Sequence, residues 1–226
     1  MQVTLGPLSK NQKIFFAELI GTFGLLVSAT GSIVYDGRVG GILGIGFISL
    51  MHFVGIFFMI FFLGRYSMAH FNPAVTVGFF IAKYITAKQI IAYVSAQAAG
   101  AFLGSLFVKY VFGDYARLGL NSPNYAYLPG QFFGVEVLAT IFLMGSIMLA
   151  ISIKRLSSAA VSAIIAGTVA LDVFFLGAIS GASMNPIRSL APAVITNVLG
   201  DLWLYWSAPF IGASIVAVIY KKKFVK

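Results

Sequence analysis

Residues 69–76 read Ala-His-Phe-Asn-Pro-Ala-Val-Thr, and residues 180–189 read Ser-Gly-Ala-Ser-Met-Asn-Pro-Ile-Arg-Ser. Asn is a favoured N-cap residue and Pro is favoured at the first helical position, so each Asn-Pro pair begins a helix. The apolar segments that follow, Pro73–Ala82 and Pro186–Asn197, reach only about 15–18 Å, because a helix rises about 1.5 Å per residue. That is half of a bilayer core of roughly 30 Å. The sequence therefore predicts two half-spanning helices.

The composition is that of a chain surrounded by lipid. Hydrophobic residues make up 60% of the 226 residues and charged residues 9%, with a mean hydropathy of +0.97, whereas soluble domains are roughly 25% charged. The absence of cysteine excludes disulfides and thiolate chemistry. No nucleophile–base pair or metal-ligand cluster stands out, so we expect no enzyme activity, metal or cofactor. The net charge of +9 is interpreted as a topology signal and not as a nucleic-acid site.

Six further apolar stretches are long enough to cross a bilayer, which takes about 20 helical residues. They are Ile14–Val34, Ile42–Leu63, Gln89–Phe112, Gln131–Ile153, Ala159–Gly177 and Leu202–Tyr220. The first is too long for a signal peptide. Six spans place both termini on one side, together with most of the 15 Lys and Arg residues. The positive-inside rule then predicts a multi-pass protein of the cell membrane with both termini in the cytoplasm.

The two halves of the chain match each other in one order and at nearly one spacing. The matched pairs are Glu18 with Glu136, Asn72 with Asn185, and Tyr93 with Tyr205. Such matches indicate duplication, and three spans per half make the second copy inverted in the membrane. We therefore expect one transmembrane domain over residues 1–226, with one repeat at about 10–112 and the other at about 130–221. The predicted fold class is an all-α membrane protein with six transmembrane helices, two half-spanning helices and an inverted repeat.

Inversion brings the two half-helices in from opposite faces, so their N-termini converge near the centre. Each N-terminus carries roughly half a positive charge, and Asn72 and Asn185 each offer a free side-chain amide donor. A water that accepts from both donors cannot accept from the next water, which interrupts a proton wire, and the positive ends repel cations. Carbonyl groups in the preceding irregular segments should line the rest of the path. These residues are Met68, Ala69, His70, Phe71, Gly181, Ser183 and Met184.

With these motifs, the first-span Glu18-x-x-Gly-Thr-Phe and the third-span Ala96-Gln97, the sequence resembles an aquaporin, a member of the major intrinsic protein family. The resemblance covers all six spans. It implies paired pore motifs at Asn72-Pro73-Ala74 and Asn185-Pro186-Ile187, and a homotetramer with one pore per subunit in membrane lipid. It also implies buried structural roles for Glu18, Glu136 and Gln97. Met68 and Ile187 depart from the family pattern, which usually has Gly and Ala there, and we expect Ile187 to lie beside the pore.

Counting back from the two Asn residues, the family's four outer filter positions fall on His52, Val173, Ala182 and Arg188. Arg188 lies in the first turn of a half-helix, where the helix dipole disfavours a cation and the apolar surroundings make it costlier. An arginine at such an unfavourable position indicates a function, and the resemblance implies that this function is in the outer filter. Strict water channels have His at the position of Val173. The aliphatic Val173 resembles instead the residue of some archaeal members.

Two sets of residues point to different permeating solutes. Ser189 after the filter arginine, a short loop before it and Tyr205-Trp206 resemble the water-selective members. Val173 and Ala182 leave more width and an apolar wall. The sequence predicts a passive water channel that excludes protons and ions, with leakage of small uncharged solutes such as glycerol. The alternatives are a glycerol or small-polyol facilitator, and a secondary transporter, which would need titratable groups at the midplane.

Overall fold

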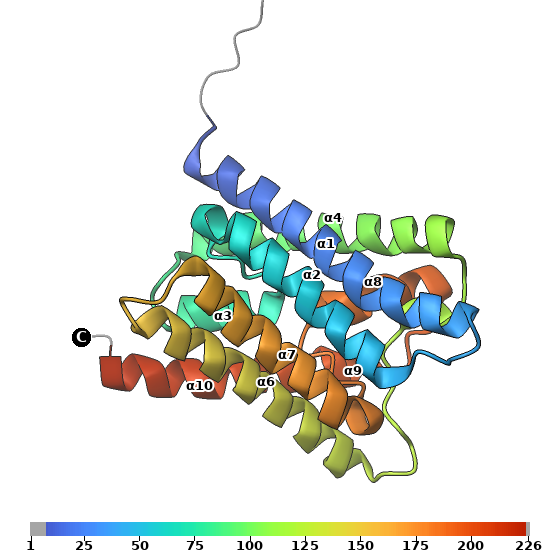
Figure 1. Ribbon diagram of the computed structural model, residues 1–226. Helices are drawn as coiled ribbons and strands as arrows, with labels where there is room; N and C mark the ends of the chain where they lie inside the picture. Colours follow the sequence, from blue (N-terminus) through green and yellow to red (C-terminus); the bar gives the residue numbers. More distant parts are fainter. Residues whose placement is uncertain (1–7, 225–226) are drawn as a thin grey trace, which may run out of the picture.

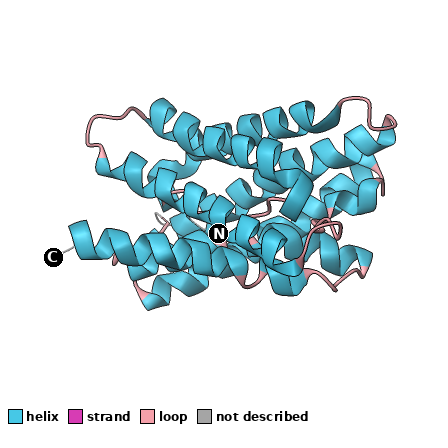
Figure 2. Ribbon diagram, turned by 90° about the horizontal axis from the view of Figure 1, so that it is seen from below, coloured by secondary structure: helices cyan, strands magenta, loops and turns pink. Residues whose placement is uncertain are grey.

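The computed structural model describes residues 8–224, which form helices and loops without a strand (Figures 1 and 2). Six helical segments in this part are long and apolar enough to cross a membrane. They are α1 (Lys10–Arg38), α2 (Gly44–Ser67), α4 (Ala87–Phe112), α6 (Pro129–Ser152), α7 (Ser158–Ser180) and the pair α9 (Leu202–Tyr205) and α10 (Ala208–Phe224). The half-helices are α3 (Pro73–Ile81) and α8 (Pro186–Thr196). The predicted all-α fold is confirmed.

The half-helices begin where the Asn-Pro pairs predict. Asn72 Oδ1 accepts a hydrogen bond from the Ala74 amide at 2.8 Å, and Asn185 Oδ1 accepts one from the Ile187 amide at 3.2 Å. Pro occupies the first turn of both helices, where its missing N–H costs nothing. These caps satisfy amides that would otherwise be orphaned at the centre of the bundle.

The two repeats pack by the same rule. In the first repeat α1 lies against α4, and in the second α6 lies against α10. Each half-helix packs on the third span of the other repeat, α3 on α10 and α8 on α4, and α2 contacts α7. A Cβ on Gly100 would lie 2.3 Å from the Leu19 carbonyl oxygen, and one on Gly212 would lie 2.5 Å from that of Val137. Glycine at both positions therefore permits close helix contact.

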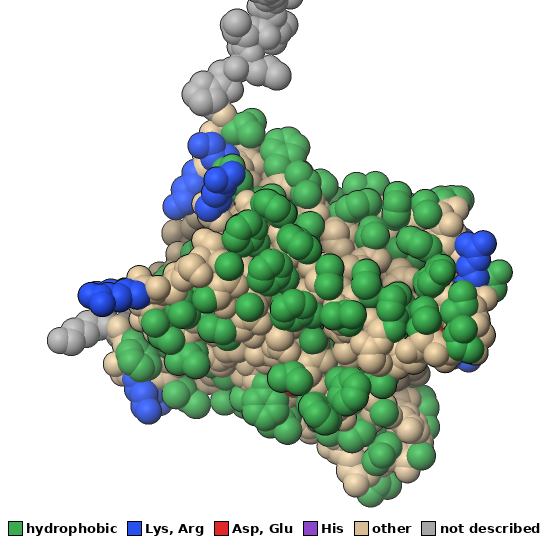
Figure 3. Space-filling model, in the orientation of Figure 1, with side chains coloured by type: hydrophobic (Ala, Val, Ile, Leu, Met, Phe, Trp, Pro, Cys, Tyr) green, Lys and Arg blue, Asp and Glu red, His purple; other side chains and the backbone are tan. Residues whose placement is uncertain are grey.

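The outer surface matches a lipid environment. Figure 3 shows hydrophobic side chains over most of one face, with Lys and Arg gathered at its two ends. Large apolar side chains such as Leu149, Phe175 and Ile219 are more than half exposed. Exposed apolar surface of this extent suits hydrocarbon and not water.

One span differs from the sequence prediction, and one loop has an unusual backbone. The last span is interrupted at Trp206–Ser207, between α9 and α10, because Pro209 has no N–H to donate back to Tyr205. In the loop after α4, the short element α5 (Ala116–Gly119) is a left-handed turn, since Arg117 has a φ of 49°.

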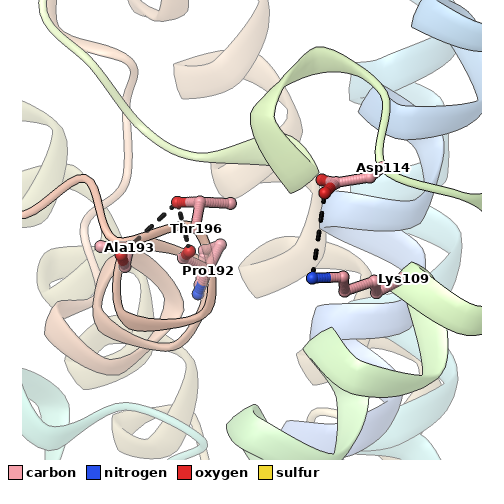
Figure 4. Close-up of polar contacts among 5 residues, drawn as sticks. All are labelled: Lys109, Asp114, Pro192, Ala193 and Thr196. Atoms are coloured by element: carbon pink, nitrogen blue, oxygen red, sulfur yellow. Dashed lines mark hydrogen bonds and ion pairs between the residues drawn. The ribbon is translucent and has the colours of Figure 1, made fainter.

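Two local contacts lie beside this loop. Lys109 and Asp114 form an ion pair at 3.8 Å near its start. Thr196 Oγ1 donates to the Pro192 carbonyl at 2.7 Å at the end of α8 (Figure 4). Both contacts lie at the end of the bundle opposite to the N-terminus of α1, where α4 and α8 finish.

Candidate functional site

Asn72 and Asn185 meet at the centre of the bundle and join the two repeats. Asn72 Nδ2 donates to the Met184 carbonyl at 2.8 Å, and Asn185 Nδ2 donates to the Phe71 carbonyl at 2.9 Å. Each side-chain amide thus uses one N–H on a carbonyl of the opposite loop, a contact that the sequence did not predict. A side-chain amide has two N–H groups, so one remains on each Asn for a molecule between the half-helices.

The loops that precede the half-helices hold matched left-handed backbone. The positive φ angles occur at Met68 (62°), Ala69 (51°), Phe71 (48°), Gly181 (84°), Ala182 (40°) and Met184 (55°). For residues other than glycine this conformation costs about 1–2 kcal/mol each. Met68 adopts the same region as Gly181, so its departure from the family pattern leaves the local path unchanged.

Two buried glutamates offset this backbone cost. Glu18 accepts from Ser67 Oγ at 2.6 Å and from the amides of His70 and Phe71 at 2.9 and 2.7 Å. Because hydrogen bonds to a charged group each stabilise by about 1.5–3 kcal/mol, three such bonds are similar in size to the strain of the three left-handed residues in this loop.

Glu136 repeats this arrangement in the second half of the chain. It accepts from Ser180 Oγ at 2.9 Å and from the amides of Ser183 and Met184 at 3.3 and 2.5 Å. Both glutamates are fully buried. The two glutamates accept hydrogen bonds from the loops and donate none. They orient the loop amides away from the centre of the bundle, which leaves the loop carbonyls able to face it.

The remaining buried polar groups brace the loops from behind. Tyr93 donates to the Ser67 carbonyl at 2.6 Å, and its repeat mate Tyr205 donates to that of Ser180 at 2.7 Å. Gln97 donates to Glu18 at 2.8 Å, but Pro209 stands at the corresponding place in the second repeat. The two halves are therefore alike in the glutamate and tyrosine contacts and unlike in this one.

Three adjoining cavities form a path through the bundle, and the two Asn residues line the middle one. The middle one offers about 50 Å³ to the centres of water molecules, which is room for about three to five waters at roughly 10–15 Å³ each. It shares Ala69 and Val75 with a wider cavity of about 650 Å³ on the side of Arg65. It shares His52 and Arg188 with one of about 220 Å³ on the opposite side. The path is thus narrow at the centre and wide at both ends.

The middle cavity has one polar and one apolar wall. The polar wall comes from the two loops, with Ala69, His70, Phe71, Asn72, Ala182, Ser183, Met184 and Asn185. The apolar wall comes from the spanning helices and from Val75 of the half-helix α3. Its residues in the spanning helices are Leu25, Ala29, Ile56, Ile60, Leu143, Ile147, Ile165 and Val169. Met68 lines the wide cavity near Arg65, and Gly181 lines the one at the other end. A file of waters here has hydrogen-bond partners along one side only.

The four residues assigned to the outer filter lie at the junction of the narrow and outer cavities. His52 and Arg188 line both cavities, whereas Ala182 lines the narrow one and Val173 the outer one. The Nδ1 atom of His52 lies 2.8 Å from the Ile48 carbonyl. A carbonyl can only accept, so Nδ1 carries the hydrogen and Nε2 remains an acceptor in the neutral ring. The structure thus brings these four side chains to the junction of the two cavities, and their role as a filter remains a prediction.

Asn121 is a site residue that the sequence did not single out. Its Oδ1 accepts from Arg188 Nη1 and, at 2.9 Å, from Ser189 Oγ, and its Nδ2 donates to the Gly181 carbonyl at 2.8 Å. The bond from Nη1 is the one side-chain hydrogen bond of Arg188 in residues 8–224. Asn121 is 4% exposed and lies in the loop after α4. Only its polar type in the loop between α4 and α6 hinted at a role.

Two residues lie away from the path. Ile187 was expected beside the pore, but it is buried with Leu26, Ala101 and Ala191 between α8 and its neighbours and lines none of the three cavities. The expectation was wrong because the turn of the helix after Asn185 points this side chain outward from the centre. Asp172 is 4% exposed, and its Oδ2 has no hydrogen-bond partner among the described residues.

Comparisons with known proteins agree with this geometry. Residues 8–220 match the family model "Major intrinsic protein". Aquaporin NIP1-4 of Oryza sativa subsp. japonica is 33% identical over 212 residues, covering 92% of this chain and 76% of the relative. Probable aquaporin NIP7-1 of Arabidopsis thaliana is 33% identical over 222 residues, covering 97% and 78%.

A solved structure gives the same result for the fold. The X-ray structure of the aquaglyceroporin from Plasmodium falciparum superimposes with a TM-score of 0.86 over 95% of this chain and 97% of that chain, at 22% identity. The chain belongs to the major intrinsic protein family, and it is therefore a channel of the aquaporin type and not an enzyme.

Proposed function

We propose that this protein is a passive water channel that excludes protons and ions and admits some small neutral solutes. The observation that carries the proposal is the meeting of Asn72 and Asn185 in a cavity of about 50 Å³ between two helix N-termini. The amide hydrogens left on the two Asn residues can both bind one water oxygen. That water then donates in both directions, so a proton cannot hop through it, and the positive helix ends oppose cations.

His52, Val173, Ala182 and Arg188 are proposed as the outer filter. Two polar and two small apolar side chains around this junction would accept a polyol with its hydroxyls on one side and its carbons on the other. This supports some glycerol permeation beside water. The solved relative is called an aquaglyceroporin, and the plant relatives are called aquaporins, which supports testing both solutes.

Orientation and assembly belong to the same proposal. The gathering of Lys and Arg at the end with the α1 N-terminus and α10 C-terminus (Figure 3) supports a cytoplasmic location of that end in the cell membrane. Family membership supports a homotetramer with one pore per subunit, each chain being one domain of two repeats. Light scattering on the detergent-solubilised protein measures the mass of the assembly.

The test is stopped-flow light scattering on proteoliposomes. An outward osmotic step should shrink them faster than empty vesicles, with a low activation energy, and solute flux should rise linearly with concentration. Saturation of the flux would favour a secondary transporter, and a water permeability equal to that of empty vesicles would overturn the proposal.

A further inference from the structure

The end of the bundle that holds the α1 N-terminus is basic and carries no acid. Its Lys and Arg residues in the described part are Lys10, Lys13, Arg65, Lys83, Lys88, Lys154, Arg155, Lys221, Lys222 and Lys223. The six acids of the chain lie elsewhere: Glu18, Glu136 and Asp172 are buried in the bundle, and Asp36, Asp114 and Asp201 lie at the opposite end. No acidic side chain of the described residues can therefore pair with the cations at this end.

A groove between α6 and α10 opens at the same end. It encloses about 380 Å³. Its lining residues are Gly145, Met148, Leu149, Ser152, Val216, Ile219, Tyr220, Lys223 and Phe224. The wall is apolar from Gly145 to Leu149, and its polar groups gather at the far end, at Ser152, Tyr220 and Lys223. One cationic and two hydroxyl groups thus lie at the end of an apolar groove.

The hydroxyls form a chain that can turn toward an acceptor. Tyr220 OH lies 3.0 Å from Ser152 Oγ and 2.9 Å from Tyr84 OH. The Ser152 hydrogen is held by the Met148 carbonyl at 2.6 Å, so Tyr220 donates to Ser152 and Tyr84 donates to Tyr220. A phosphate oxygen in the groove would take the Tyr220 hydrogen in place of Ser152. In the loop before α4, burial and the bond to Tyr220 raise the pKa of Tyr84 to about 12, so its phenol stays protonated as a donor.

The depth of the groove matches one leaflet. From Gly145 to Ser152 the helix rises about 10 Å, which is most of the roughly 15 Å of hydrocarbon in half a bilayer. We propose that this groove binds an anionic phospholipid, with an acyl chain along Gly145 and Leu149 and the phosphate at Lys223 and Tyr220. Free phosphate would leave the apolar length of the groove uncovered, so the lipid is the better occupant.

Native mass spectrometry of the full-length protein, titrated with phosphatidylglycerol or phosphatidylcholine of equal chain length, tests the proposal. Wild type should bind phosphatidylglycerol about fivefold more tightly, which is the effect of one lysine near an anionic lipid. Lys223→Gln should remove that preference, and Lys222→Gln, which changes a neighbouring lysine outside the groove lining, should keep it. Inorganic phosphate should not displace the lipid.

Gly145→Leu tests the acyl part of the groove. A Cβ at Gly145 has no heavy atom within 4 Å, so leucine fills the groove without disturbing the fold and should weaken both lipids. Gly167→Leu is the matched control, because Gly167 in α7 also faces open space and lies outside the groove. Equal binding of the two lipids by wild type, wild-type binding by Lys223→Gln, or equal losses in the control variants would overturn the proposal.

Discussion

Replacing Asn121 by alanine should release Arg188 and loosen solute selection. The substitution removes the acceptor of the Nη1 hydrogen bond and the 2.8 Å bond to Gly181. A hydrogen bond to a charged group stabilises by about 1.5–3 kcal/mol. Its loss should lower the population of the bonded Arg188 conformer relative to the released conformers by about 10- to 100-fold. The ratio of glycerol to water permeability should rise toward that of Arg188→Val, which marks complete loss of the cation.

The assay is stopped-flow permeability for both solutes on the same proteoliposome preparations. Asn124→Ala is the control, because Asn124 lies in the same loop and its side chain bonds the Ala178 carbonyl at 3.3 Å and the Ala126 amide at 3.0 Å, but not Arg188. Asn121→Asp keeps an acceptor for Arg188 and should keep most of the selectivity. A wild-type permeability ratio in Asn121→Ala, with Arg188→Val altered, would refute the idea that Asn121 holds the arginine.

Four further substitutions and one control test the width of the path and the packing of the helices. Val173→His should narrow the outer ring and cut glycerol flux much more than water flux; equal proportional losses would remove Val173 from the filter. Gly100→Ala and Gly212→Ala should each lower the free energy of unfolding by about 1–3 kcal/mol, because the new methyl meets a backbone oxygen, whereas Gly134→Ala, in open space, should not. Asp172→Leu should raise that free energy by about 1–3 kcal/mol, since it removes a buried carboxyl oxygen without a partner; a loss of stability on thermal unfolding would show an unrecognised contact.

Most of the fold could be predicted because membrane insertion leaves its mark in local sequence. The lengths of the apolar runs gave the six spans, and Asn-Pro at residues 72–73 and 185–186 gave the starts of the half-helices. The break after Tyr205 was missed, since the run Leu202–Tyr220 is apolar throughout and hides the effect of Pro209 on the helix.

The site was predicted less completely because its contacts join distant parts of the chain. The mutual bonds of Asn72 and Asn185 use carbonyls of the opposite loop, and no local pattern indicates how many amide hydrogens remain. Asn121 reaches Arg188 from a loop whose path includes a left-handed turn. Ile187 was placed by its position beside Asn185, but the side-chain direction follows from the helix turn and its packing.

The central claim is that water passes between Asn72 and Asn185 while protons do not. The most direct measurement loads proteoliposomes with a pH-sensitive dye and records water flux and the decay of a pH gradient in the same preparation. The proposed mechanism predicts osmotic shrinkage well above that of empty vesicles, with a pH gradient that decays no faster than in empty vesicles. Decay of the gradient that accelerates in proportion to the amount of protein would contradict it.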